Sequence, residues 1–136
     1  MIGWRGRCRP MCGQAQVAYV DDDPRLRSLM TEELLDEGVK PLICCTGQEL
    51  LDLLEIEKVD LIFLDLMMPV MDGLTCLQQL KELSLNIPVL VVTSFNDENK
   101  RQQSLSQGAK DYILKPNMLE QLPLLLDQYL DKNRNN

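Results

Sequence analysis

Short apolar runs alternate along the chain with longer segments in which leucines recur at helical spacing. The apolar runs cover residues 17–20, 41–45, 61–64, 88–92 and 111–114. Most of them are followed by apolar residues three and four positions apart, a spacing typical of an amphipathic helix. Continuous apolar runs predict strands buried on both faces. The pattern therefore predicts five βα units over residues 16–131, an α/β fold with a parallel sheet and helices on both faces.

Local signals at the expected helix ends agree with these units. Asp23 is a good N-cap, Pro24 after it suits the first helical position, and Gly38 ends the first helix. Thr46 and Glu49 have the spacing of a capping box for the second helix. The helix boundaries are therefore predicted independently of the apolar periodicity.

Two of the expected helices depart from the regular pattern. The polar segment 97–107 contains Leu105 as its only large apolar residue, so we expect the fourth helix to be the least firmly anchored. In the last helix, Pro123 removes a backbone hydrogen bond and favours a kink unless the helix starts late. Leu124 falls off the apolar face of this helix, either as an ordinary surface leucine or as a contact for a partner.

Polar residues stand at the ends of four of the expected strands. Asp21 and Asp22 follow the first, Asp65 ends the third, Thr93 ends the fourth and Lys115 follows the fifth. Because the carboxyl ends of parallel strands share one edge of a sheet, these side chains should meet there. Three carboxylates at close range repel one another unless cations compensate them. An all-oxygen set without histidine or thiolate favours Mg²⁺, and Lys115 adds a second positive charge.

Composition narrows the class of protein. The chain has 136 residues, enough for one domain, and its 45% apolar and 26% charged residues are globular values. A net charge of −7 opposes binding to nucleic acid and to anionic membranes. The absence of histidine excludes Ser-His-Asp catalysis, histidine-containing zinc sites and a phosphohistidine on this chain. No segment approaches the roughly 18 apolar residues of a membrane span, so we expect a cytoplasmic protein.

The ends of the chain differ from its middle. Residues 1–14 hold three arginines and no acid, and we expect them to be a basic extension outside the core. The domain itself is expected over residues 15–132. The polar tail 133–136 could be a true terminus or the cut edge of a longer protein.

The five cysteines are an odd number, which favours free thiols in a reducing cytosol over a disulfide framework. Cys44 and Cys45 lie in an apolar run and are expected to act as small core residues. Cys8 and Cys12 have no second pair at matching spacing, so we expect an unpaired surface segment rather than a metal site.

Four motifs surround the expected strand ends. They are Val20-Asp21-Asp22-Asp23, the nine residues from Asp65 to Gly73, Val92-Thr93-Ser94, and Tyr112-Ile113-Leu114-Lys115-Pro116. In this order and at these separations, they resemble the receiver domain of two-component response regulators, the CheY-like family, over nearly the whole chain. The resemblance implies a flavodoxin-like (βα)5 fold with strand order 2-1-3-4-5.

The resemblance also implies roles for the strand-end residues. Asp65 would accept a phosphoryl group from a histidine of a sensor kinase or phosphotransfer protein. Mg²⁺ would be held by Asp65, Asp22 and the backbone carbonyl of Met67, with Asp21 acting directly or through water. Lys115 would neutralise negative charge developing on the phosphoryl oxygens. Such a domain is a signalling module that assists its own phosphorylation and dephosphorylation, not a conventional enzyme.

A conformational switch is implied as well. Thr93 would hydrogen-bond the phosphoryl group, and Tyr112 would rotate into the space that Thr93 leaves. Taken alone, Tyr112 could be a half-buried strand aromatic, but its place three residues before Lys115 favours the switch. A cis peptide between Lys115 and Pro116 would aim the lysine at the acceptor, and X-Pro bonds carry a low penalty for this isomer.

Two further features concern the lifetime of the phosphoryl group and the contact with a downstream partner. Met67 and Phe95 would flank the phosphoryl group and, being apolar, could not orient a water, which predicts slow self-dephosphorylation. The competing interpretation is that Met67 faces solvent and Phe95 packs on the fourth helix. The last helix, residues 118–130, has no basic residue, which argues against the DNA-binding dimer that many family members form. The domain would contact a downstream protein or a fused output domain through the fourth helix, the fifth strand and the fifth helix.

Three alternatives to a free-standing, phosphorylated receiver make different demands on the sequence. A Mg²⁺-dependent phosphatase would need an acid two residues after the nucleophile, and Met67 occupies that place. A docking scaffold that is never phosphorylated would not need the acceptor, the acidic pair and the lysine, all of which are present. A receiver module cut from a larger multidomain regulator remains compatible with the sequence.

Overall fold

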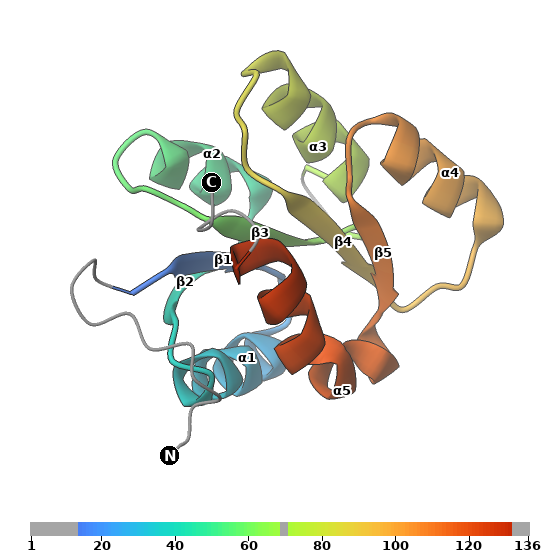
Figure 1. Ribbon diagram of the computed structural model, residues 1–136. Coiled ribbons are helices and arrows are strands. Elements are labelled where there is room, and N and C mark those ends of the chain that lie inside the picture. The colour runs from blue at the N-terminus through green and yellow to red at the C-terminus, as the bar shows by residue number, and fades with distance from the viewer. Residues whose placement is uncertain (1–13, 69–70, 132–136) are drawn as a thin grey trace.

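A computed structural model describes residues 14–68 and 71–131, and these residues form one five-stranded parallel sheet in the order β2-β1-β3-β4-β5 (Figure 1). The strands are β1 (Gln16–Val20), β2 (Lys40–Cys44), β3 (Leu61–Asp65), β4 (Val89–Thr93) and β5 (Asp111–Leu114). This is the expected flavodoxin-like strand order. Some of the expectations concern positions outside the described residues, namely Cys8, Cys12, Pro69, Val70 and the polar tail.

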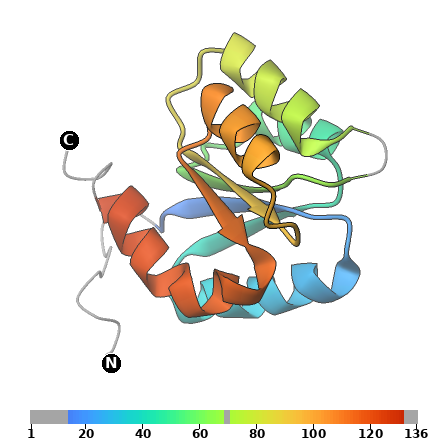
Figure 2. The ribbon, with the colours of Figure 1, turned by 90° about the vertical axis from the view of Figure 1, so that its right-hand side faces the viewer.

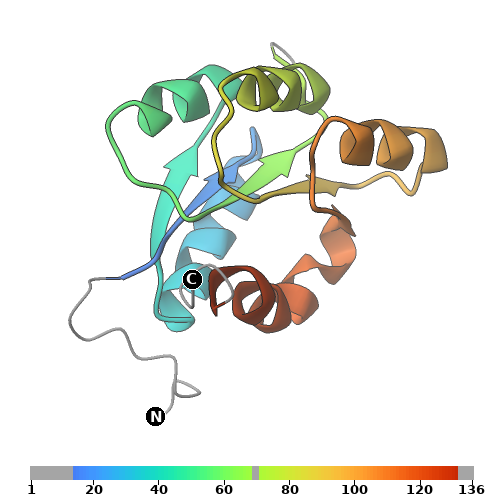
Figure 3. The ribbon, with the colours of Figure 1, turned by 45° about the horizontal axis from the view of Figure 1, so that its top comes forward.

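The expected alternation of strands and helices is confirmed. The helices are α1 (Pro24–Asp36), α2 (Gly47–Leu54), α3 (Gly73–Glu82), α4 (Glu98–Ser106) and α5 (Lys115–Leu126), and a π-helical turn η1 (Asp127–Asp131) continues α5. Figures 2 and 3 show α1 and α5 on one face of the sheet and α2, α3 and α4 on the other. No helix in the described part of the chain is both long and apolar enough to cross a membrane.

Each face of the sheet has its own apolar core. Tyr19 and Phe63 point into the layer covered by α1 and α5, whereas Ile62 and Leu64 point into the layer covered by α2 and α3. Every residue of β3 and β4 is buried, because both faces of these central strands are covered. The unbroken apolar runs in the sequence follow from this double coverage.

The helix ends form largely as expected. The Asp23 side chain caps α1 by accepting from the Arg25 backbone N–H, and Gly38 follows the helix with φ 82°. Thr46 caps α2 by accepting from the Glu49 N–H at 3.1 Å. The Glu49 carboxylate accepts from Cys45 N–H at 2.6 Å, so the second half of the capping box reaches one residue before the N-cap.

The two unusual helices behave differently. Ser104 is the buried residue of α4, and Leu105 is only partly buried, which confirms the expected weak anchoring of this helix. Helix α5 begins at Lys115 and continues through Pro123 to Leu126. Leu124 is 66% exposed, as its position off the apolar face predicts.

The prediction of a cis peptide before Pro116 is wrong, because the described residues contain no cis peptide bond. The strand β5 passes directly into α5 at Lys115, so Pro116 lies in the first turn of a helix. A proline in that place needs no backbone donor and its fixed φ suits the helix, so the trans peptide is accommodated without a turn.

Candidate functional site

The carboxyl edge of the sheet brings the predicted acidic residues together. Val20 pairs with Leu64 in the register of β1 and β3, so Asp21 emerges beside Asp65. One carboxylate oxygen from each of Asp21, Asp22 and Asp65 lies within 4.8 Å of the others. Asp21 and Asp65 are buried, whereas Asp22 is exposed to solvent. The cluster therefore has a buried base and an open side.

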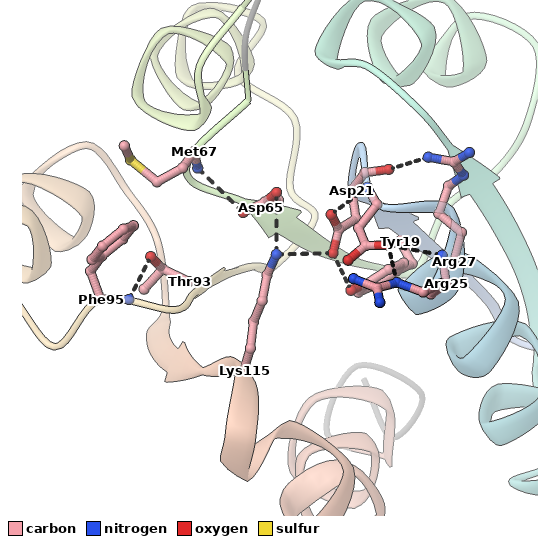
Figure 4. A network of polar contacts seen from close by, with 10 residues as sticks. Tyr19, Asp21, Arg25, Arg27, Asp65, Met67, Thr93, Phe95 and Lys115 are labelled. Atoms are coloured by element: carbon pink, nitrogen blue, oxygen red, sulfur yellow. Dashed lines mark hydrogen bonds and ion pairs between the residues drawn. The ribbon is translucent and has the colours of Figure 1, made fainter.

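Lys115 reaches into this cluster from the end of β5 (Figure 4). Its Nζ lies 3.2 Å from Oδ2 of Asp21 and 3.4 Å from Oδ2 of Asp65. Burial disfavours the charged lysine, but the Asp65 and Asp21 carboxylates outweigh it and raise the pKa of Lys115. The lysine therefore stays positively charged between two carboxylates.

The charge of Asp65 is only partly compensated. Burial and the negative charge of Asp21 raise the pKa of Asp65, while Lys115 and the Met67 N–H act in the opposite direction. That N–H donates to Oδ1 of Asp65 at 3.3 Å. A divalent cation at the open side would remove the remaining imbalance. An all-oxygen donor set with one exposed carboxylate, that of Asp22, fits Mg²⁺, which prefers octahedral oxygen ligands and retains waters.

The sequence did not indicate how firmly Asp21 is held. Tyr19 donates its hydroxyl to Oδ2 of Asp21 at 2.6 Å, and the Asp23 N–H donates to Oδ1 at 3.0 Å. Arg27, from the first turns of α1, donates to the backbone carbonyl of Asp21 at 2.9 Å. Side chains two residues apart on a strand share a face, and this period of two was the available signal for Tyr19.

The β4 and β5 side of the site is more open. Thr93 is fully buried at the end of β4, and its Oγ accepts from the Phe95 N–H at 3.2 Å. Tyr112 is only partly buried and donates its hydroxyl to the Phe95 carbonyl at 2.9 Å. Met67 and Phe95 are 46% and 54% exposed. These residues therefore lie at the same edge of the sheet, with Phe95 exposed and Tyr112 partly buried against the core.

The glycine of the long motif allows a close approach of two backbones. A Cβ at Gly73 would lie 2.5 Å from Cα of Leu66, and the Gly73 N–H donates to the Leu66 carbonyl at 2.7 Å. Asp72 caps α3 by accepting from the Thr75 N–H at 2.8 Å. The end of the motif therefore fixes the start of α3 against the strand that carries Asp65.

This geometry agrees with comparisons to known proteins. The family model of the response regulator receiver domain matches residues 17–127. The chain belongs to this family. Response regulator MprA of Mycolicibacterium vanbaalenii is 36% identical over 107 residues, which are 79% of this chain and 46% of the relative. The receiver domain therefore spans about half the length of the curated relatives it matches.

Solved receiver structures have the same fold. A CheY-like receiver domain protein from Methanospirillum hungatei is 27% identical, with a TM-score of 0.84 over 90% of this chain and 98% of that chain. Vibrio cholerae chemotaxis protein CheY4 is 28% identical, with a TM-score of 0.80 over 86% and 99%. The sequence resemblance to receiver domains is thus confirmed at the level of family and fold.

Proposed function

We propose that this receiver domain takes a phosphoryl group onto Asp65 from a phosphohistidine of a sensor kinase or histidine phosphotransfer protein. The supporting observation is the convergence of Asp65 with Lys115, at 3.4 Å, and with the carboxylates of Asp21 and Asp22. A buried carboxylate beside a lysine and an open acidic face has both a nucleophile and the means to balance its charge. The chain is in this proposal a signalling module rather than a conventional enzyme.

The chemistry follows from the positions of the charges. An oxygen of Asp65 attacks phosphorus, and the bond between phosphorus and the donor imidazole nitrogen breaks, with the electron pair staying on the imidazole. Lys115 holds the negative charge that develops on the phosphoryl oxygens. Asp22, Asp65 and the backbone carbonyl of Met67 would hold Mg²⁺, with Asp21 acting directly or through water. When bound, Mg²⁺ would supply further neutralisation of negative charge.

The conformational response would begin at Thr93. Its Oγ accepts from the Phe95 N–H, and its hydroxyl would donate its proton to a phosphoryl oxygen on Asp65. Movement of Thr93 towards that oxygen would draw the end of β4 inward. Tyr112 would then exchange its bond to the Phe95 carbonyl for a position nearer the space beside Thr93. The readout would use α4, β5 and α5.

The proposal extends to the setting in which the domain works. Residues 15–132 would form the receiver unit, with residues 1–14 and 133–136 outside its core. The free thiols of Cys44, Cys45 and Cys76 suit a reducing cytoplasm. Signals would pass by protein contact, to a separate protein or a fused output domain, and not by direct binding to nucleic acid or membrane.

Intact mass spectrometry tests this function. Incubation with acetyl phosphate and Mg²⁺ should add roughly 80 Da, one phosphoryl group, and Asp65→Asn should abolish the gain. Asp72→Asn is the matched control, because asparagine can keep the helix cap and the residue lies in the same motif. An unchanged mass gain in Asp65→Asn would contradict the assignment. A parent protein that gains no mass would favour a docking scaffold instead.

A further inference from the structure

Tyr19 brings a hydroxyl into the acidic cluster from inside the sheet. The side chain is fully buried, and its ring belongs to the apolar cluster between the sheet and helices α1 and α5. Its hydroxyl nevertheless donates to Oδ2 of Asp21 at 2.6 Å. Figure 4 shows the two side chains next to each other. A phenylalanine would fill the same space. The Tyr19 hydroxyl therefore contributes a hydrogen bond to the Asp21 carboxylate and is not needed to fill the apolar core.

Asp21 is bound on both of its oxygens by the protein. Oδ1 accepts from the Asp23 N–H at 3.0 Å, and Oδ2 accepts from Tyr19 and lies 3.2 Å from Lys115 Nζ. The residue has no exposed surface, so solvent cannot replace a lost partner. The neighbouring Asp22, by contrast, is exposed to solvent.

We propose that Tyr19 is a positioning residue of the cation site, holding Asp21 so that its charge faces the ion that Asp22 and Asp65 bind. The inference rests on the proposed function, since it concerns the same Mg²⁺ site. Tyr19 and Lys115 donate to the same oxygen of Asp21. Without the hydroxyl, Lys115 is the remaining donor to that oxygen among the described residues, and it would be drawn towards Asp21, where it competes with the ion.

Removing the hydroxyl should weaken cation binding while the fold remains. Groups that orient metal ligands without touching the metal contribute about 10- to 100-fold to affinity. We expect Tyr19→Phe to raise the dissociation constant for Mg²⁺ about tenfold, measured by isothermal titration calorimetry. Tyr129→Phe is the matched control, because Tyr129 lies in η1 near Pro88, at the opposite edge of the sheet. Equal or tighter binding by Tyr19→Phe would overturn the proposal.

A second measurement uses Tyr19 itself as the reporter. Because its acceptor carboxylate faces the ion, Mg²⁺ should change the near-ultraviolet tyrosine absorption of the parent and of Tyr129→Phe. The change should be lost in Tyr19→Phe. A parent that binds Mg²⁺ without any change, or a Tyr19→Phe variant that keeps it, would contradict the positioning role. These results are separate from the mass gain at Asp65, so the proposed function can stand where the role of Tyr19 fails.

Discussion

The acidic half of the site and the half formed by β4, α4 and β5 are held in place by different means. Asp21 and Asp65 are buried, and Lys115 lies within 3.4 Å of both. On the other side, the Thr93 hydroxyl accepts a hydrogen bond from the backbone N–H of Phe95, two residues later in the chain. The Phe95 side chain is 54% exposed. One half is fixed by buried charge, whereas in the other the strand β4 is buried and helix α4 and the exposed Phe95 have few contacts that resist movement.

The helices beside the two halves show the same contrast. Helix α3 buries Cys76, Leu77 and Leu80 against the sheet, whereas Ser104 is the buried residue of α4. Displacing α4 therefore exposes little apolar surface, and apolar burial is the main energy that holds a helix to a sheet. The proposed function, in which Asp65 accepts the phosphoryl group and α4 and β5 move, would benefit from this division.

The largest effect we expect concerns the buried charge in the acidic half. In a metal-free buffer containing a chelator, burial and Asp21 raise the pKa of Asp65 in the folded state. The folded protein then binds more protons than the unfolded chain between the two pKa values, so its free energy of unfolding falls as pH rises above about 4. Asp65→Asn removes this loss and should be about 2 kcal/mol more stable than the parent at pH 8.

Urea unfolding at a series of pH values measures this difference. The advantage of Asp65→Asn should shrink as the pH is lowered towards 4, where the unfolded chain also keeps its proton. Asp36→Asn, a change to an exposed carboxylate at the other end of α1, is the control. A gap between Asp65→Asn and the parent that stays constant over the whole pH range would show that the acidic half is not strained by its charge.

Much of the fold was predictable, because a sheet covered by helices on both faces requires continuous apolar runs in its strands. The buried strands β3 and β4 appear as apolar runs, and Asp65 and Thr93 end them. The features that the sequence did not predict depend on local conformation. The bond from Tyr19 to Asp21, two residues apart, depends on the rotamers of both side chains, and the trans peptide before Pro116 depends on how β5 enters α5.

A smaller effect is expected in the weakly anchored helix. The Oγ of Ser104 is buried and has no hydrogen-bond partner within the described part of the chain. An unsatisfied buried hydroxyl destabilises the folded state, so Ser104→Ala should raise the free energy of unfolding by about 1 kcal/mol. Ser106→Ala, on the exposed side of the same helix, controls for the better helix propensity of alanine. If the two changes raise the free energy of unfolding equally, the unsatisfied hydroxyl of Ser104 does not destabilise the folded state.

The smallest effect concerns the lifetime of the phosphoryl group in the open half. Met67 and Phe95 are about half exposed, and Figure 4 shows them on the same side of Asp65 as Thr93. Neither side chain can accept a proton from water or hold it in line with phosphorus, which favours slow self-dephosphorylation. The double variant Met67→Asn/Phe95→Glu should therefore lose its phosphoryl group about threefold faster, a change of less than about 1 kcal/mol in the barrier.

Loss of the added mass after removal of acetyl phosphate, under saturating Mg²⁺, measures this rate. Leu124→Asn is the control, because it introduces a polar side chain at an exposed leucine of α5, away from the strand ends. Faster loss in the double variant alone would mean that the two apolar side chains limit the access or orientation of water. If the parent decays as fast as the double variant, the exposed parts of Met67 and Phe95 do not shield phosphorus. The lifetime would then be set by movement of the β4–α4 segment, which the weak anchoring of α4 permits.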